Sequence, residues 1–169
     1  FTTAAEAFRM ERERLGNSQF SEALAAGIAG TVQGFRTTGD RMNRALSNLG
    51  AVGTQRGFSM AEQFSALGLL QGSFEAPVAG TGMKTFIAQL TRASEKLGVE
   101  FSDASGEALS LVATLRRIDD ALQGMTQGQR QEKLIEAFGT EAGPATLALL
   151  AGVDQLEKSA GELNKKMDR

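Results

Sequence analysis

Apolar residues recur along most of this chain at the spacing of an α-helix, and short polar or glycine-containing segments separate the runs. The clearest run starts at Met83 and has apolar residues 3, 4, 7, 10 and 14 positions later, which form one face of a helix. This run predicts a helix over residues 83–97. A second helix is predicted over 59–71, and the small residues of 76–82 are expected to form the break between the two.

Several of the expected helices start at a residue whose side chain can cap the first turn. Ser59 is followed three residues later by Glu62, which is the spacing of a capping box. Asp40, Ser110 and Thr126 also precede apolar runs and are expected to cap them. The expected helices are 1–15, 20–35, 41–49, 59–71, 83–97, 110–123, 126–138, which ends at Gly139, and a further helix from Thr140 with a break at Gly152.

One segment lacks helical spacing. Val99 and Phe101 alternate with polar residues, and residues 103–106 have the composition of a turn, so we expect at most one tiny hairpin near 99–108. The chain has only two prolines, which leaves long helices undisturbed. The pattern therefore predicts an all-α fold, a compact multi-helix bundle of about seven to nine helices.

The composition fits a globular domain and removes several kinds of chemistry. The 169 residues are 41% hydrophobic and carry 18 basic and 20 acidic side chains, which allows a core and gives no basic excess for a nucleic-acid surface. Cysteine and histidine are absent, which excludes disulfides, thiolate sites and the commonest general base and metal ligand. No apolar run reaches the length of about 18 residues that a membrane span needs, and no signal-peptide pattern is present.

Residues 80–85, Gly-Thr-Gly-Met-Lys-Thr, resemble a phosphate-binding loop only in part. The phosphate-loop pattern requires two glycines, one directly before the lysine and one six positions before the lysine. Met83 and Val78 occupy those places, and no strand precedes the segment. The sequence therefore favours a helix start with close packing over a nucleotide site.

Four acidic residues are the strongest candidates for acid–base chemistry: Asp103, Glu107, Asp119 and Asp120. Two carboxylates can act together on a glycosidic bond. Asp119 and Asp120 lie on the outer side of a predicted helix, so a solvated face is the favoured interpretation. Residues 103–107 lack the ligand periodicity and the distal glutamate of a calcium loop, and they are better interpreted as a turn.

Two segments suggest contact with a partner or a membrane. Residues 9–14 alternate in charge, which favours a solvated face over a basic arm that reaches a partner, because glutamates separate the arginines. Residues 23–32 are rich in alanine and glycine, which suits close helix packing in water and also in lipid. Gln33, Arg36 and the shortness of the apolar run argue against a membrane-active segment.

The order of motifs from about residue 40 to 165 resembles the core region of tail tape measure proteins of tailed bacteriophages and prophages. In that family a Gly-x-Ser-x-x-Glu helix start leads through an Ala- and Leu-rich helix to Ala-Gly-Thr, then to a helix that closes on Leu-Gly, a turn, and a Phe-Gly-x-Glu-Ala element. The matching residues here are 57–62, Ala79, Gly80, Thr81, Leu97, Gly98, 103–106, Phe138, Gly139, Glu141 and Ala142. Phe74, Pro77 and Gly82 depart from the family pattern.

The resemblance implies a structural, non-enzymatic protein without cofactors or metals. Family members lie in the lumen of the virion tail, set the tail length and leave the tail ahead of the DNA at infection. Implied partners are tail tube and tail assembly proteins and other copies of the protein, with no specific nucleic acid and with host membrane contact on ejection. The implied locations are the tail lumen and, during assembly, the host cytoplasm. The resemblance assigns a packing role to Ala79, Gly80, Thr81, Phe138 and Gly139.

Residues 1–16 are expected to form a charged N-terminal helical arm, and residues 17–169 the helical tape-measure core domain. The chain begins with Phe1 rather than Met, so we expect a fragment of a longer protein. Three alternatives stay open. They are a membrane-interacting module, suggested by 23–32 and the pair Leu69 and Leu70, a cell-wall-degrading module that uses Asp119 or Glu107, and an unrelated helical adaptor.

Overall fold

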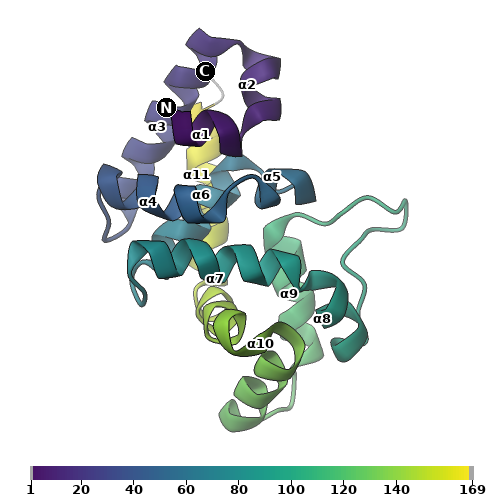
Figure 1. The fold of residues 1–169 in the computed structure, drawn as a ribbon. Coiled ribbons are helices and arrows are strands. Elements are labelled where there is room, and N and C mark those ends of the chain that lie inside the picture. Colours follow the sequence, from purple (N-terminus) through teal and green to yellow (C-terminus); the bar gives the residue numbers. More distant parts are fainter. Residues whose placement is uncertain (1, 168–169) are drawn as a thin grey trace.

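The computed structural model describes residues 2–167, and these residues form helices joined by short connections (Figure 1). The described residues contain no named strand, and the predicted all-α fold is confirmed. The helices are α1 (Thr2–Ala7), α2 (Arg9–Leu15), α3 (Asn17–Gly34), α4 (Gly39–Leu49), α5 (Val52–Arg56), α6 (Met60–Leu70), α7 (Ala76–Ala88), α8 (Leu90–Leu97), α9 (Leu111–Ala121), α10 (Gln127–Ala151) and α11 (Val153–Met167).

Most of the predicted helix starts are confirmed because the capping residues act locally. Ser59 Oγ accepts the Glu62 backbone N–H at 3.1 Å, and Glu62 Oε1 accepts the Ser59 N–H at 3.2 Å, which completes the capping box. Ser110 and Thr126 cap α9 and α10 as expected. The prediction for α4 is wrong, because Thr38, with an extended backbone, accepts the Arg41 N–H, while Asp40 already lies inside the helix.

Two predicted continuous helices are each split by one residue. The predicted helix 83–97 divides at Gln89, where φ is −93° and ψ is 2°, into α7 and α8. The predicted helix 1–15, whose first residue lies outside the described residues, divides at Phe8. The spacing of apolar residues cannot predict either split, because the apolar face continues across both. Phe8 is fully buried and Leu90 is nearly so. The described residues therefore form 11 helices, nine of them at least seven residues long.

The small residues of 76–82 do not form the expected break. They lie inside α7, which starts directly after Glu75 and has Pro77 in its first turn, where a proline lacks no needed hydrogen bond. Glycine is unfavourable within a helix by about 1 kcal/mol relative to alanine. Here the tertiary contacts of α7 outweigh that preference.

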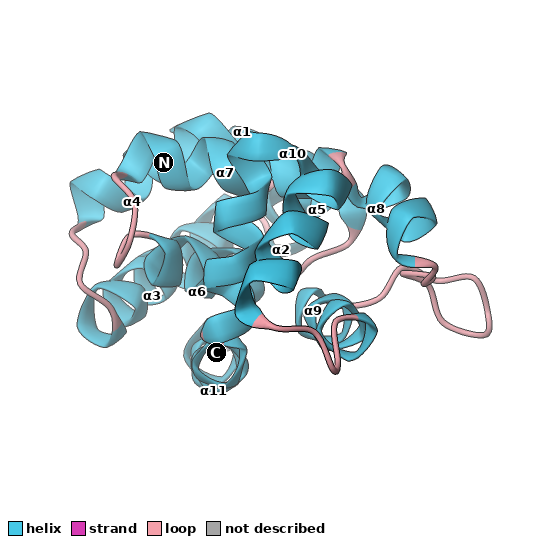
Figure 2. Ribbon diagram, turned by 90° about the horizontal axis from the view of Figure 1, so that it is seen from below, coloured by secondary structure: helices cyan, strands magenta, loops and turns pink. Residues whose placement is uncertain are grey.

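Helix α6 forms the centre of the core. Ten of its eleven residues are buried, among them the polar Glu62, Gln63 and Ser65. Helices α3 and α11 pack against α6, and α7 packs between α4 and α10. Figure 2 places α7 and α10 on one side of α6 and α11 on the other. The core is continuous from Ala4 near the N-terminus to Leu163 in α11.

The first two helices pack on this core. Helix α1 contacts α4, and the Phe8 and Phe64 rings form a T-shaped pair with centroids 5.4 Å apart. Helix α2 runs beside α3 and carries the charged residues of the predicted arm. The division into an arm at 1–16 and a core at 17–169 stays a prediction.

The segment between α8 and α9 extends away from the body of the molecule (Figures 1 and 2). Its base contains one isolated antiparallel bridge between Ser102 and Ala108, and Phe101 is buried. Arg117 donates to the carbonyl oxygens of Glu100 and Ser102. This matches the expectation of at most one tiny hairpin near 99–108.

Candidate functional site

Helix α7 is held between two other helices by glycines on opposite faces. Gly80 is buried, and a Cβ at this position would lie 2.8 Å from Asn48 Cβ and closer still to the Ala45 carbonyl oxygen of α4. A Cβ at Gly82 would lie 3.1 Å from Ala145 Cβ of α10. Two positions along a helix correspond to a rotation of about 200°, so the two glycines face nearly opposite directions. The segment thus allows two helix backbones to approach α7 at once.

The other residues of the expected packing motif lie on α7 and on α10, which packs against α7. Ala79 is buried beside Gly80, whereas Thr81 is exposed. Phe138 is fully buried and its ring stacks on Phe86 of α7, with centroids 5.1 Å apart and an interplanar angle of 22°. The two halves of the motif, far apart in the sequence, therefore meet along α7. Their packing role remains a prediction until it is tested by substitution.

Glycine is required at position 139 by its backbone conformation, whereas at Gly80 it is required by the lack of space. Its φ is 88° and its ψ is 174°, a region that only glycine adopts readily. No atom lies within 4 Å of a Cβ built at Gly139, so space is not the constraint. The residue kinks α10 and separates the segment that starts at Thr126 from the segment that contains Pro144, as the sequence predicted.

Sequence reasoning missed the second role of Glu62. Its Oε1 atom caps α6, while its Oε2 accepts the backbone N–H of Val112 in the first turn of α9 at 3.1 Å. The side chain is mostly buried. One carboxylate therefore satisfies free N–H groups of two helix N-termini, where negative charge is favourable. No spacing rule could find this contact, because Val112 lies 50 residues from Glu62.

The partial phosphate-loop motif does not form a loop. Residues 80–85 lie in the middle of α7, so their backbone N–H groups belong to the helix, and Lys84 is exposed. The helix start expected within residues 80–85 is wrong, because α7 already begins at Ala76. Gly80 and Gly82 lie close to α4 and α10, and the packing role expected for this segment stays a prediction.

The acidic candidates do not converge. Asp119 pairs with Arg130 at 2.6 Å, and Asp120 is exposed on α9. Asp103 lies in the projecting turn, where Ser105 Oγ and the N–H groups of Ser105 and Glu107 donate to its carboxylate. The Ser105 hydroxyl, followed by the Glu107 N–H, lowers the pKa of Asp103. Within residues 2–167, no group of three or more acidic side chains is placed to hold a metal.

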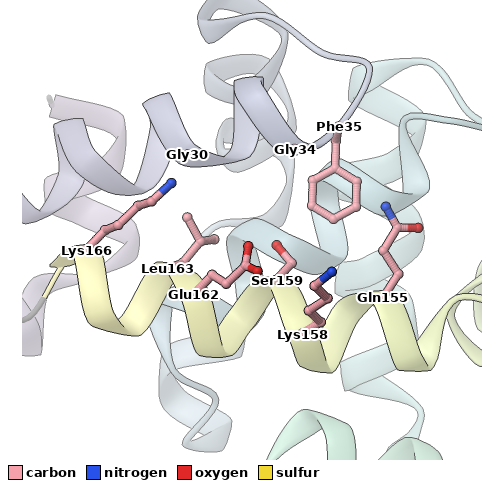
Figure 3. Close-up of a pocket in the computed structure, with 9 residues that line it drawn as sticks. All are labelled: Gly30, Gly34, Phe35, Gln155, Lys158, Ser159, Glu162, Leu163 and Lys166. Atoms are coloured by element: carbon pink, nitrogen blue, oxygen red, sulfur yellow. The ribbon is translucent and has the colours of Figure 1, made fainter.

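The small-residue segment of α3 has packing partners of its own. A Cβ at Gly27 would meet the Phe64 ring, and one at Gly30 would meet Leu163 of α11. Figure 3 shows Leu163 directed toward Gly30, with Lys158, Ser159 and Glu162 along the same side of α11. A shallow hollow of about 170 Å³ lies between the two helices. Its lysine and glutamate side chains reach solvent, and the hollow is small for a ligand.

The residues that suggested a membrane module are likewise engaged in the fold. Leu70 is fully buried, and the space that a Cβ would need at Gly152 is occupied by Leu69. Across residues 2–167, no helix combines the length and the apolar character that a membrane crossing requires.

Comparison with known proteins connects this architecture to a family. The profile of the family described as "Phage-related minor tail protein" matches residues 1–139. This chain belongs to that phage tail family. A protein named "Tape measure protein" from Pneumococcus phage Dp-1 is 30% identical over 131 residues. The resemblance to tail tape measure proteins is thereby confirmed, and a structural role in the phage tail follows from it.

The two matches cover different parts of the chain and of the relative. The family match contains the whole of the Gly80 contact and ends at Gly139, at the kink of α10. The alignment with the Dp-1 protein covers 72% of this chain but only 11% of that relative, so the chain corresponds to a small part of it. No solved structure matches the chain.

Proposed function

We propose that this chain is a non-catalytic structural domain of a tail tape measure protein, that it lies in the tail lumen and that it contributes to the length of the tail. The supporting observation is the family match over residues 1–139 together with a fold built of helices from Thr2 to Met167. A helix has a fixed rise of about 1.5 Å per residue. A chain with high helical preference can therefore act as a length standard when it is extended.

The domain has two very different lengths in its folded and extended forms. Extended as one helix, its 169 residues would span about 250 Å. Folded, a chain of this size has a radius of gyration of about 15 Å and a diameter of about 40 Å. We propose that the extended form is the one that contributes to the tail, with ejection ahead of the DNA as the later step.

Electron microscopy of tails can test this proposal. In the phage that encodes the chain, an in-frame duplication of residues 1–169 should lengthen the tail by about 250 Å, and an in-frame deletion should shorten it by the same amount. A change of about 40 Å would show that the domain stays folded in the tail. Particles of unchanged length from the duplication would contradict a role in setting length, and the duplication remains informative if the deletion prevents assembly.

A further inference from the structure

Helix α5 is the short helix that joins α4 to α6 (Figure 1), and two unpaired polar atoms lie at its contacts. Within residues 2–167, the buried side-chain atoms without a hydrogen bond are Oε1 of Gln63 in α6 and Nε of Arg56 in α5. A buried polar atom without a partner is unfavourable, because it has lost its hydrogen bonds to water and gained none in the protein. The packed position of α5 therefore carries a penalty that its displacement would remove.

The Gln63 side chain holds α5 in place through only one end of its amide group. Its Nε2 donates to the Phe58 carbonyl oxygen at 3.0 Å and to Thr54 Oγ1 at 3.3 Å. Its Oε1 lies against Gly53 of α5, at the place that a Cβ would need. The side chain is fully buried, so the carbonyl end stays unpaired for as long as α5 covers it.

Helix α5 has few other contacts and a glycine hinge at each end. It is five residues long and has no side-chain cap, and a helix this short is not stable alone in water. Val52 packs against the core but is only partly buried, and the buried Gly53 has no side chain. Gly50 and Gly57 adopt φ values of 68° and 98°, and glycine has the greatest backbone freedom of any residue.

Hollows lie on two sides of α5. One, of about 480 Å³, separates Thr54 and Gln55 from the first two helices. The other, of about 330 Å³, separates Arg56 from α8 and from the base of the projecting segment. Arg56 donates across this side to the Phe101 carbonyl oxygen at 3.3 Å. The helix that α5 packs against is α7, and the hollows leave α5 room to move without displacing another helix.

We infer that residues 51–57 form a strap that lifts from α6 and α7 on its two glycine hinges while the rest of the fold stays closed. On lifting, Gln63 Oε1 and Arg56 Nε gain hydrogen bonds to water, which offsets the lost contacts of Val52. The lifted strap unwinds, because five residues do not hold a helix alone. Such local opening needs less free energy than global unfolding. The inference concerns the folded chain and does not depend on the proposed role in tail length.

Native-state hydrogen exchange of the 169-residue chain, followed by NMR in low concentrations of urea, tests the strap. The reporting amides are those of Gln55, Gly57 and Phe58, which donate to backbone carbonyl oxygens inside the strap. They should exchange at least about 100-fold faster than the amides in the middle of α6. Their rates should hardly change with urea, because local opening exposes little surface. Equal rates in the two helices with equal urea dependence would overturn the inference.

A variant outside the strap separates local opening from global unfolding. Gly161 in α11 has no atom within 4 Å of a built Cβ, so Gly161→Ala stabilises the whole fold through its helix propensity. It should slow exchange in α6 about fivefold and leave exchange in the strap unchanged. Strap amides that slow as much as those of α6 would show that the strap opens only with the whole fold.

The Gln63 side chain separates lifting of the strap from fraying of α5 in place. Its two amide protons should exchange with the same opening constant as the strap, and if they stay protected while the strap exchanges, the lifting is contradicted. Thr54→Val removes one acceptor of Gln63 Nε2 and should speed exchange in the strap about fivefold. Thr81→Val, at an exposed position of α7, is the matched control and should change nothing there. Unchanged strap exchange in Thr54→Val would contradict the role of Gln63 as the latch.

Discussion

The close contact at Gly80 predicts a specific loss of stability in Gly80→Ala. The added methyl group would lie 2.8 Å from Asn48 Cβ and closer still to the Ala45 carbonyl oxygen, well inside the 3.4–4 Å of ordinary contact. The Ala45 oxygen belongs to the backbone of α4, so it cannot rotate away as a side chain can. Helices α4 and α7 must therefore move apart, which loosens the Met42, Leu46 and Met83 contacts of the core.

The size of the effect follows from two opposing terms. Overpacking a well-packed contact destabilises a protein by about 1–3 kcal/mol, and the rigid neighbour places Gly80 near the upper end. Alanine offsets about 1 kcal/mol of this through its better helix propensity. The net loss is about 2 kcal/mol, which for a chain of this length lowers the Tm by about 4–8 °C.

Thermal unfolding followed by circular dichroism measures this loss, and the chain offers matched controls. Gly161 lies within α11 with no atom within 4 Å of a built Cβ, so Gly161→Ala should raise the free energy of unfolding by about 1 kcal/mol. Gly82→Ala, where the neighbour is the Ala145 methyl group, should fall between the two. A Gly80→Ala protein that melts as high as Gly161→Ala would refute the close-approach argument.

Two further predictions concern carboxylates. Glu62→Ala removes an acceptor from the N-termini of both α6 and α9 and should lower the free energy of unfolding by about 2 kcal/mol in urea titrations. Glu62→Gln keeps one carbonyl oxygen and should lose about half as much, and equal stability of Glu62→Ala and wild type would contradict the double cap. The pKa of Asp103 is lowered from 3.8 by the Ser105 hydroxyl and the Glu107 N–H, so its contribution is present above pH 3.8 and is lost as the pH falls through the lowered pKa. The amide NMR signal of Ser105 should shift in that acidic range, and Asp103→Asn should remove the transition.

Local signals account for the parts of the fold that the sequence predicted correctly. Ser59, Ser110 and Thr126 each act on a backbone N–H three residues away, so the cap and its partner appear together in the sequence. Gly139 was expected to end a helix, and its positive φ is a property of one residue. Such features can be deduced without knowledge of the tertiary structure.

The parts that were predicted wrongly depend on contacts between distant segments. The glycines of 76–82 favour a break by propensity, but α4 and α10 approach them and hold the segment in a helix. The split at Gln89 leaves the apolar periodicity unchanged, so the pattern carries no sign of it. The bond from Val112 to Glu62 arises only when helices far apart in the sequence come together.

The two ends of the described chain meet at one corner of the core. Phe64 forms a T-shaped pair with Phe8 and also lies against the backbone of Gly27. Met167 reaches Gly27 from the end of α11. Figure 1 accordingly shows α1 and the end of α11 at the same end of the molecule. A pulling force applied through the two ends would therefore peel the terminal helices away a few contacts at a time instead of shearing whole helix faces. The folded segment spans little distance along the direction of pull, and a longer chain that continued on both sides would release nearly all of its length at low force.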